Sequence, residues 1–107
     1  MQPFTQRVVM IIRSIPPGKV MTYGSVAASA GSVRAARQVV RILHTLSTPQ
    51  QLPWHRVVNK YGQIALGDPD AAEEQRLRLE EEGIVFMLDG SIPLDRYRFE
   101  PDLPTEQ

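Results

Sequence analysis

Hydrophobic residues near the start of the chain recur every three or four positions and fall on one face of a helix. This spacing predicts an amphipathic helix over residues 4–15, with Arg7 and Ser14 on its opposite side. The run Pro16-Pro17-Gly18 then ends the helix, because proline cannot donate the backbone hydrogen bond that a helix interior needs. The apolar positions are Phe4, Val8, Ile11, Ile12 and Ile15.

Two further helices are expected after this break. Thr22 is typical of an N-cap, residues 25–30 are rich in alanine, and Gly31 suits the left-handed position that follows a helix end. Ser32 then caps a longer helix over residues 33–46. The two helices and their tight glycine turn resemble a helix-turn-helix, a geometry that many modules without DNA-binding activity share.

The longer helix separates its charged and apolar residues. Because successive side chains rotate by about 100° around the axis, Arg34, Arg37 and Arg41 fall within about 60° of one another. A solvated helix face normally mixes both charge signs, so three arginines without an acid favour contact with DNA phosphates. The residues expected on the opposite, core-facing side are Ala36, Val39, Val40, Leu43 and Leu46.

Short alternating segments in the second half predict two β-hairpins. Val57-Val58 and Gln63-Ile64 flank the first turn. Residues 84–88 and Ser91-Ile92 flank the second, at Asp89-Gly90.

A charged helix is expected between the two hairpins. Asp68-Pro69-Asp70 is typical of a helix start, and Gly83 closes the helix over residues 71–82. The expected fold class is therefore mainly α with short β hairpins, of helix-turn-helix or winged-helix character. We expect one domain over residues 1–100 and an acidic flexible tail over residues 101–107.

Charge is divided unequally along the chain, although the net charge is zero. Residues 1–67 contain eight basic residues and no acid, whereas residues 68–107 contain four arginines and all twelve acids. The two segments therefore carry +8 and −8. A stretch of this length without a carboxylate favours a polyanionic partner such as nucleic acid, and the alternative is a dipolar protein whose halves attract each other.

The composition excludes several kinds of chemistry. The chain has no cysteine, which excludes disulfides, a thiolate nucleophile and any zinc site that needs sulfur. Its two histidines, His44 and His55, are too few for a histidine-rich metal site, so we expect no metal and no cofactor. The longest aliphatic run, residues 8–12, is too short to span a membrane, and no signal segment opens the chain. We expect a soluble, cytoplasmic protein.

Three segments carry the candidate function. They are Ile15-Pro16-Pro17-Gly18-Lys19-Val20 leading to Thr22-Tyr23-Gly24, Arg34-Ala35-Ala36-Arg37-Gln38-Val39, and Pro53-Trp54-His55-Arg56-Val57-Val58. In order and spacing they resemble the DNA-binding domain of the O6-alkylguanine-DNA alkyltransferases, over about residues 4–83. In those enzymes the third segment contains Pro-Cys-His-Arg-Val and its cysteine accepts the alkyl group, whereas Trp54 stands at that position here. With this replacement the chain resembles the alkyltransferase-like proteins, non-enzymatic relatives in which the cysteine is replaced, often by tryptophan.

The chemistry of Trp54 also argues against alkyl transfer. An indole N–H is a donor without a usable lone pair, so it cannot replace the thiolate as a nucleophile. His55 and Glu82 match the positions that activate the cysteine in the enzymes, and we expect them to persist as a structural relay. The alternative is a general-base pair that activates water, but no oxyanion or metal apparatus accompanies it.

The resemblance implies a reader of O6-alkylguanine in double-stranded DNA. Such a protein extrudes the nucleotide into a pocket, after its helix docks in the minor groove, where sequence matters little. Tyr23 would rotate the 3′ phosphate and Arg37 would fill the vacated space. The alternatives are a half-buried core tyrosine and one more phosphate contact. The implied DNA-binding residues are Tyr23, Arg34, Arg37 and Arg41, and the implied pocket residues are Tyr23, Leu43, Trp54, His55, Val57 and Ile64.

Trp54 has two interpretations within this pocket. It forms an apolar wall for the alkyl group, or it fills space as part of the core. A basic residue that some relatives carry after the first hairpin is missing, since the chain reads Ala65-Leu66-Gly67 there. A cation stacked on the lesion from that loop is therefore not expected.

The resemblance also implies what binding is for. A monomer that binds the lesion without repairing it would flag it for nucleotide excision repair, through the UvrA damage sensor in bacteria. The acidic residues 68–107 are either a docking surface for that partner or a solubilising face. The rival from another class is a winged-helix transcription regulator, which binds undamaged DNA, usually as a dimer on paired half-sites.

Overall fold

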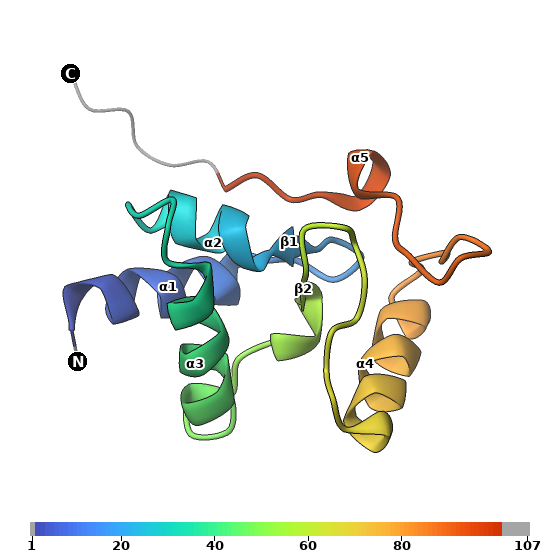
Figure 1. The fold of residues 1–107 in the computed structure, drawn as a ribbon, viewed down its shortest axis with the longest axis horizontal. Coiled ribbons are helices and arrows are strands. Elements are labelled where there is room, and N and C mark those ends of the chain that lie inside the picture. Colours follow the sequence, from blue (N-terminus) through green and yellow to red (C-terminus); the bar gives the residue numbers. More distant parts are fainter. Residues whose placement is uncertain (1, 102–107) are drawn as a thin grey trace.

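The computed structural model describes residues 2–101. This part of the chain contains five α-helices, one 3-10 turn and two short strands, joined by loops (Figure 1). The expectation of a mainly helical fold is confirmed. The predicted acidic tail lies outside the described residues apart from Pro101. In chain order the elements are α1 (Pro3–Ser14), β1 (Met21–Thr22), α2 (Tyr23–Ser29), α3 (Ala36–Leu46), η1 (Trp54–Arg56), β2 (Val57–Val58), α4 (Pro69–Glu81) and α5 (Leu94–Tyr97).

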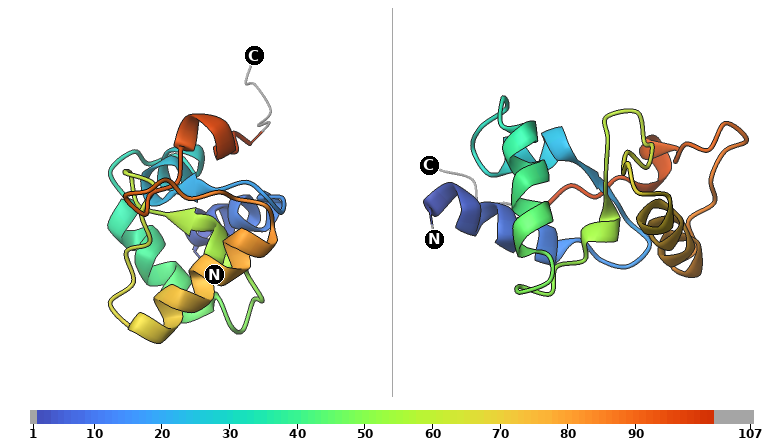
Figure 2. Two further views of the ribbon diagram at one scale, coloured as in Figure 1. Left: turned by 90° about the vertical axis from the view of Figure 1, so that its right-hand side faces the viewer. Right: turned by 60° about the horizontal axis from the view of Figure 1, so that its bottom comes forward.

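The first three helices pack around one hydrophobic core. The predicted first helix is confirmed within one residue at each end, with Pro3 in its first turn and Pro16 beyond its last. Its apolar face buries Val8 and Ile12 completely, against Val26 of α2 and Val39 of α3. Figure 2 shows α1, α2 and α3 together on one side of the molecule and α4 on the other.

Local side-chain chemistry fixes both ends of α2. The Thr22 side chain accepts a hydrogen bond from the Ser25 backbone N–H, and the Ser25 hydroxyl accepts one from the Thr22 N–H. This reciprocal capping box satisfies two donors that a helix start leaves free. Gly31 follows the helix with φ of +103°. Both predicted signals are confirmed.

The predicted start of the next helix is wrong. α3 begins at Ala36 rather than Val33, and Ser32 does not cap it. Instead the Ser32 N–H donates to the Ala27 carbonyl, the bond that completes the left-handed ending of α2. Ser32 therefore belongs to the helix before it, and Arg34 lies in the connecting turn rather than on the face of α3.

The apolar side of α3 is also divided differently from the prediction. Val39 and Ile42 are buried in the core, whereas Val40 is 46% exposed. Leu43 and Leu46 are only partly buried against that core. The helix therefore turns part of its apolar surface away from the core, and this part borders the cavity described below.

Both predicted hairpins are wrong. The two strands of the described residues are β1 and β2, and they pair with each other in parallel. Met21 aligns with Val57 and Thr22 with Val58. After β2 the Asn59 side chain accepts hydrogen bonds from the N–H groups of Tyr61 and Gln63, and this compact turn stands where the first hairpin was expected. An isolated two-stranded hairpin is marginal in water, so burying β2 beside β1 is the more stable arrangement.

The second expected hairpin is also reduced to a turn. The Met87 N–H donates to the Ser91 carbonyl across Asp89-Gly90. No strand is formed on either side of this turn within residues 2–101.

The charged helix α4 is confirmed together with its end signals. The Asp68 carboxylate caps it by accepting from the Asp70 N–H, and Gly83 follows it with φ of +94°. Its inner side buries Leu79 in a second core. The buried members of the second core are Val20, Val58, Leu79, Ile84, Ile92 and Tyr97.

None of the helices within residues 2–101 has the length and apolar character needed to cross a membrane.

We expect Gly62→Ala to lower the free energy of unfolding more than Gly90→Ala. Both glycines have a positive φ, which costs a residue with a Cβ about 1–2 kcal/mol. A Cβ at Gly62 would also clash with the Ile92 carbonyl oxygen, whereas at Gly90 it would meet no atom of the described residues within 4 Å. Urea unfolding measures both variants, and equal losses would contradict the close approach at Gly62.

Candidate nucleic-acid interface

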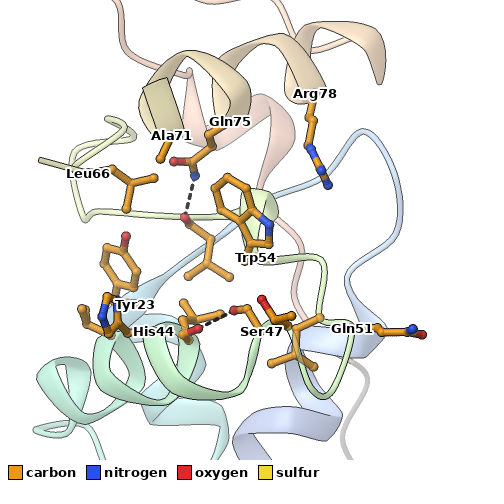
Figure 3. Close-up of a pocket in the computed structure, with 14 residues that line it drawn as sticks. Tyr23, His44, Ser47, Gln51, Trp54, Leu66, Ala71, Gln75 and Arg78 are labelled. Atoms are coloured by element: carbon orange, nitrogen blue, oxygen red, sulfur yellow. Dashed lines mark hydrogen bonds between the residues drawn. The ribbon is translucent and has the colours of Figure 1, made fainter. Parts of the chain in front are cut away.

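A cavity of about 660 Å³ lies between α3 and α4 (Figure 3). Its volume is within the range of roughly 300–1,000 Å³ that is usual for small-molecule sites. α3 and α4 supply opposite walls, and Trp54 of η1 lies between them. The lining residues are Tyr23, Val40, Leu43, His44, Ser47, Thr48, Gln51, Leu52, Trp54, Val57, Leu66, Ala71, Gln75 and Arg78.

The structure brings four of the six predicted pocket residues to this cavity and leaves two outside it. The four are Tyr23, Leu43, Trp54 and Val57. Ile64 instead lines a separate depression beside Phe86. His55 is buried and hydrogen-bonded to Glu82.

Tyr23 is the first residue of α2, so the Thr22 cap fixes its backbone next to the cavity. Burial raises the pKa of its hydroxyl above the ordinary value of 10.0. The hydroxyl is therefore protonated at neutral pH and available as a donor. Figure 3 shows the Tyr23 ring extending from the α2–α3 side toward Leu66.

Trp54 is half-buried between a histidine and an arginine. Its ring meets His55 edge-on, with ring centroids 6.2 Å apart. On α4, the Arg78 guanidinium lies 5.6 Å from the centre of the Trp54 ring, a cation–π contact. Arg78 is also paired with Glu74 at 2.6 Å. The indole is thus held by neighbours on two sides.

Sequence reasoning missed the contribution of α4 to the cavity, since it assigned this helix an acidic, solvated face. Ala71, Gln75 and Arg78 are spaced four and three residues apart and therefore share one side of the helix. Gln75 is 1% exposed. That spacing is the signal that could have identified the wall.

The three arginines that were predicted to bind DNA line one groove, which is distinct from the cavity and from the depression at Ile64. Arg34, Arg37 and Arg41 are exposed and line a groove of about 640 Å³ on the outer side of α3. Tyr23 lies at the cavity and not in this groove. Because Val40 and Leu43 line the cavity, one helix borders the apolar cavity and the basic groove.

Glu82 forms the centre of a hydrogen-bond network behind Trp54. Its carboxylate accepts from His55 Nε2 at 2.8 Å and from the Arg56 guanidinium at 2.7 and 3.0 Å. The Gly18 backbone N–H donates to it at 3.1 Å, and Arg56 also donates to the Ile15 carbonyl at 2.9 Å. The network therefore joins the end of α4 to η1 and to the turn after α1.

This network also determines the charge state of Glu82. Burial acts to raise the pKa of Glu82, but the hydrogen bonds from Arg56, His55 and the Gly18 N–H outweigh it and lower the pKa from 4.5 to about 2. The carboxylate is therefore ionised at neutral pH and fully engaged. Neither Glu82 nor His55 lines the cavity, so the pair does not present a general base to it.

Among the described residues, no cluster of three His, Asp or Glu side chains could hold a metal ion. The lining of the cavity is instead suited to binding. It offers aromatic and aliphatic surface with a few amide and hydroxyl groups.

The chain is similar to several known proteins. Residues 3–84 match the family described as 6-O-methylguanine DNA methyltransferase, DNA binding domain. The chain is 51% identical over 96 residues to a DNA base-flipping protein of Escherichia coli strain K12, covering 90% of this chain and 74% of that protein. It is 42% identical over 85 residues to alkyltransferase-like protein 1 of Schizosaccharomyces pombe, covering 78% of this chain and 79% of that protein.

Two solved structures share the fold. One is S. pombe Atl1 in complex with damaged DNA containing O6-carboxymethylguanine, with a TM-score of 0.79, 38% identity, and coverage of 94% of this chain and 98% of that chain. The other is the Mycobacterium tuberculosis O6-methylguanine methyltransferase, with a TM-score of 0.62, 28% identity, and coverage of 77% and 49%. The expected fold type is thereby confirmed.

We expect the Glu82 network to make stability depend on pH in the acid range. Because the folded pKa of about 2 lies below the unfolded value near 4.5, the stabilisation is present above pH 4.5 and is lost as the pH falls toward 2. Glu82→Gln should lower the free energy of unfolding at pH 7 by about 2 kcal/mol, as expected for hydrogen bonds to a charged group. It should also flatten the acid dependence.

Urea unfolding at pH 7 and pH 3 measures both effects. Glu81→Gln, at the exposed neighbouring residue, is the matched control and should leave the acid dependence unchanged. An unchanged pH profile in Glu82→Gln would contradict the assignment of the acid dependence to this carboxylate.

Proposed function

We propose that this chain, which belongs to the alkyltransferase-like DNA base-flipping proteins of the O6-methylguanine DNA methyltransferase family, is a sensor of O6-alkylguanine in double-stranded DNA. It does not transfer the alkyl group, because the chain has no cysteine to accept it. The observation that carries the proposal is the dual position of α3. Its outer side contributes to the arginine groove and its inner side to the cavity.

Nucleotide flipping follows from what a lesion reader must reach. The O6 edge of guanine is stacked and paired inside the duplex, so a protein that inspects all of it extrudes the nucleotide. Arg34, Arg37 and Arg41 would hold the backbone in the minor groove, where base sequence is read poorly. Tyr23, between that backbone and the cavity, would rotate the 3′ phosphate, and Arg37 would occupy the vacated space.

The cavity would then receive the extruded base. Trp54 supplies an apolar wall on which the alkyl group packs, and each buried CH₂ contributes about 0.8 kcal/mol. Larger adducts would therefore bind more tightly than methyl. The S. pombe Atl1 complex with DNA containing O6-carboxymethylguanine supports this assignment, since that protein shares the fold over nearly its whole length.

Binding without repair implies transfer of the lesion to other proteins. In the proposed sequence of events a cytoplasmic monomer marks the lesion for nucleotide excision repair through UvrA. The exposed acids of α4, including Glu80 and Glu81, would form the docking surface. Glu82 does not belong to that surface, because its carboxylate is held inside the network.

A test of the proposal compares Arg37→Ala with wild type on matched duplexes that contain guanine or O6-methylguanine. If Arg37 fills the space left by the flipped nucleotide, its loss should weaken lesion binding about tenfold, or 1.4 kcal/mol, and weaken undamaged DNA less. Fluorescence anisotropy at fixed salt measures both affinities.

Arg96→Ala is the control, since Arg96 is exposed on α5, away from α3 (Figure 1). It should leave both affinities unchanged. Equal losses on the two duplexes in Arg37→Ala would reduce Arg37 to a phosphate contact. Preference for one undamaged sequence, with indifference to the lesion, would instead support a winged-helix regulator.

A further inference from the structure

The α4 wall of the cavity contains a buried amide whose oxygen has no partner. Gln75 is 1% exposed, and its Nε2 donates to the backbone carbonyls of His55 and Val57 at 3.1 and 3.0 Å. Because both neighbours are acceptors, the nitrogen must face them and the orientation of the amide is fixed. Its Oε1 accepts no hydrogen bond from any of the described residues.

An unpaired buried acceptor is costly unless something uses it. Leaving such a group unsatisfied costs about 1–3 kcal/mol, which makes it unusual in a well-packed wall. Figure 3 shows the amide oxygen on the side of Gln75 that faces Leu66 and Ala71, both of which line the cavity. Leu66 is 37% exposed and belongs to a segment outside the helices and strands, so it lies at the open side of the cavity rather than in a packed core.

The position of this oxygen decides which part of a flipped nucleotide meets it. In the proposed function the arginine groove holds the DNA backbone on the α3 side, and α4 forms the opposite wall of the cavity. The O6 atom of guanine lies on the edge of the base remote from the sugar. A base that enters from α3 therefore directs its O6 substituent toward α4.

We propose that Gln75 is a specificity-determining residue that favours O6 adducts carrying a hydrogen-bond donor, such as a 2-hydroxyethyl group. The inference rests on the proposed function, since it assigns the lesion to this cavity. The hydroxyl of the adduct donates to Gln75 Oε1, while the alkyl carbons pack on Trp54. An O6-propyl group has the same number of heavy atoms but leaves the amide oxygen unpaired.

The experiment measures the affinity of the whole chain for four duplexes at fixed salt. They contain guanine, O6-methylguanine, O6-(2-hydroxyethyl)guanine or O6-propylguanine at one position. One added neutral hydrogen bond predicts that the hydroxyethyl duplex binds about fivefold more tightly than the propyl duplex. Equal affinity for these two, with both preferred over guanine, overturns the role of Gln75 and leaves the proposed function standing. No preference for any adduct over guanine overturns both.

Two variants assign the preference to Gln75. Gln75→Met removes the acceptor and should bring the hydroxyethyl-to-propyl ratio to about one, with circular dichroism as the check on folding. Gln75→Lys keeps protons for the carbonyls of His55 and Val57, and should favour an O6-carboxymethyl adduct, which accepts, over the hydroxyethyl adduct. Gln6→Lys adds the same charge on the exposed side of α1 and should leave the ratios unchanged. A fivefold ratio that persists in Gln75→Met, or an unchanged adduct order in Gln75→Lys, overturns the proposal.

Discussion

The rest of this structure depends on the hydrogen bonds that the Glu82 carboxylate accepts. It joins Gly18, which is 64 residues away in the chain, to His55 and Arg56, which are 27 and 26 residues away. These contacts hold η1 between the two cores and so fix Trp54 at the cavity. His55 and Glu82 are thus engaged in holding the fold together.

The network holds the α4 wall of the cavity in place, and α3 forms the opposite wall. α3 also contributes to a second surface, the arginine groove. Residues on one side line the apolar cavity, and arginines on the other side form a groove without acids. The proposed docking groove and the cavity are thus separated by about the width of one helix, roughly 10 Å. In the proposed function, one helix therefore couples docking on DNA to inspection of the base.

The sequence predicts those features that depend on neighbouring residues, and misses those that depend on distant ones. Thr22 and Asp68 begin helices, and Gly83 follows the end of one, through local hydrogen bonds and backbone angles, so their roles could be predicted. The parallel pairing of Met21 with Val57 joins segments far apart in the chain, and no local pattern indicates it. The resemblance implied a pocket with Tyr23 and Trp54, and both line the cavity, whereas Gln75 was missed because its spacing from Ala71 and Arg78 is weak evidence on a helix with so many charged residues.

The most direct test of lesion reading is a titration of the wild-type protein against two duplexes that differ only in one O6-methyl group. Trp54 is the sole tryptophan of the chain, so its fluorescence reports on the cavity while anisotropy reports on the DNA. A lesion reader should prefer O6-methylguanine by at least about tenfold, or 1.4 kcal/mol, at fixed salt. Equal affinity for both duplexes would contradict the account and leave a basic DNA-binding domain without lesion specificity.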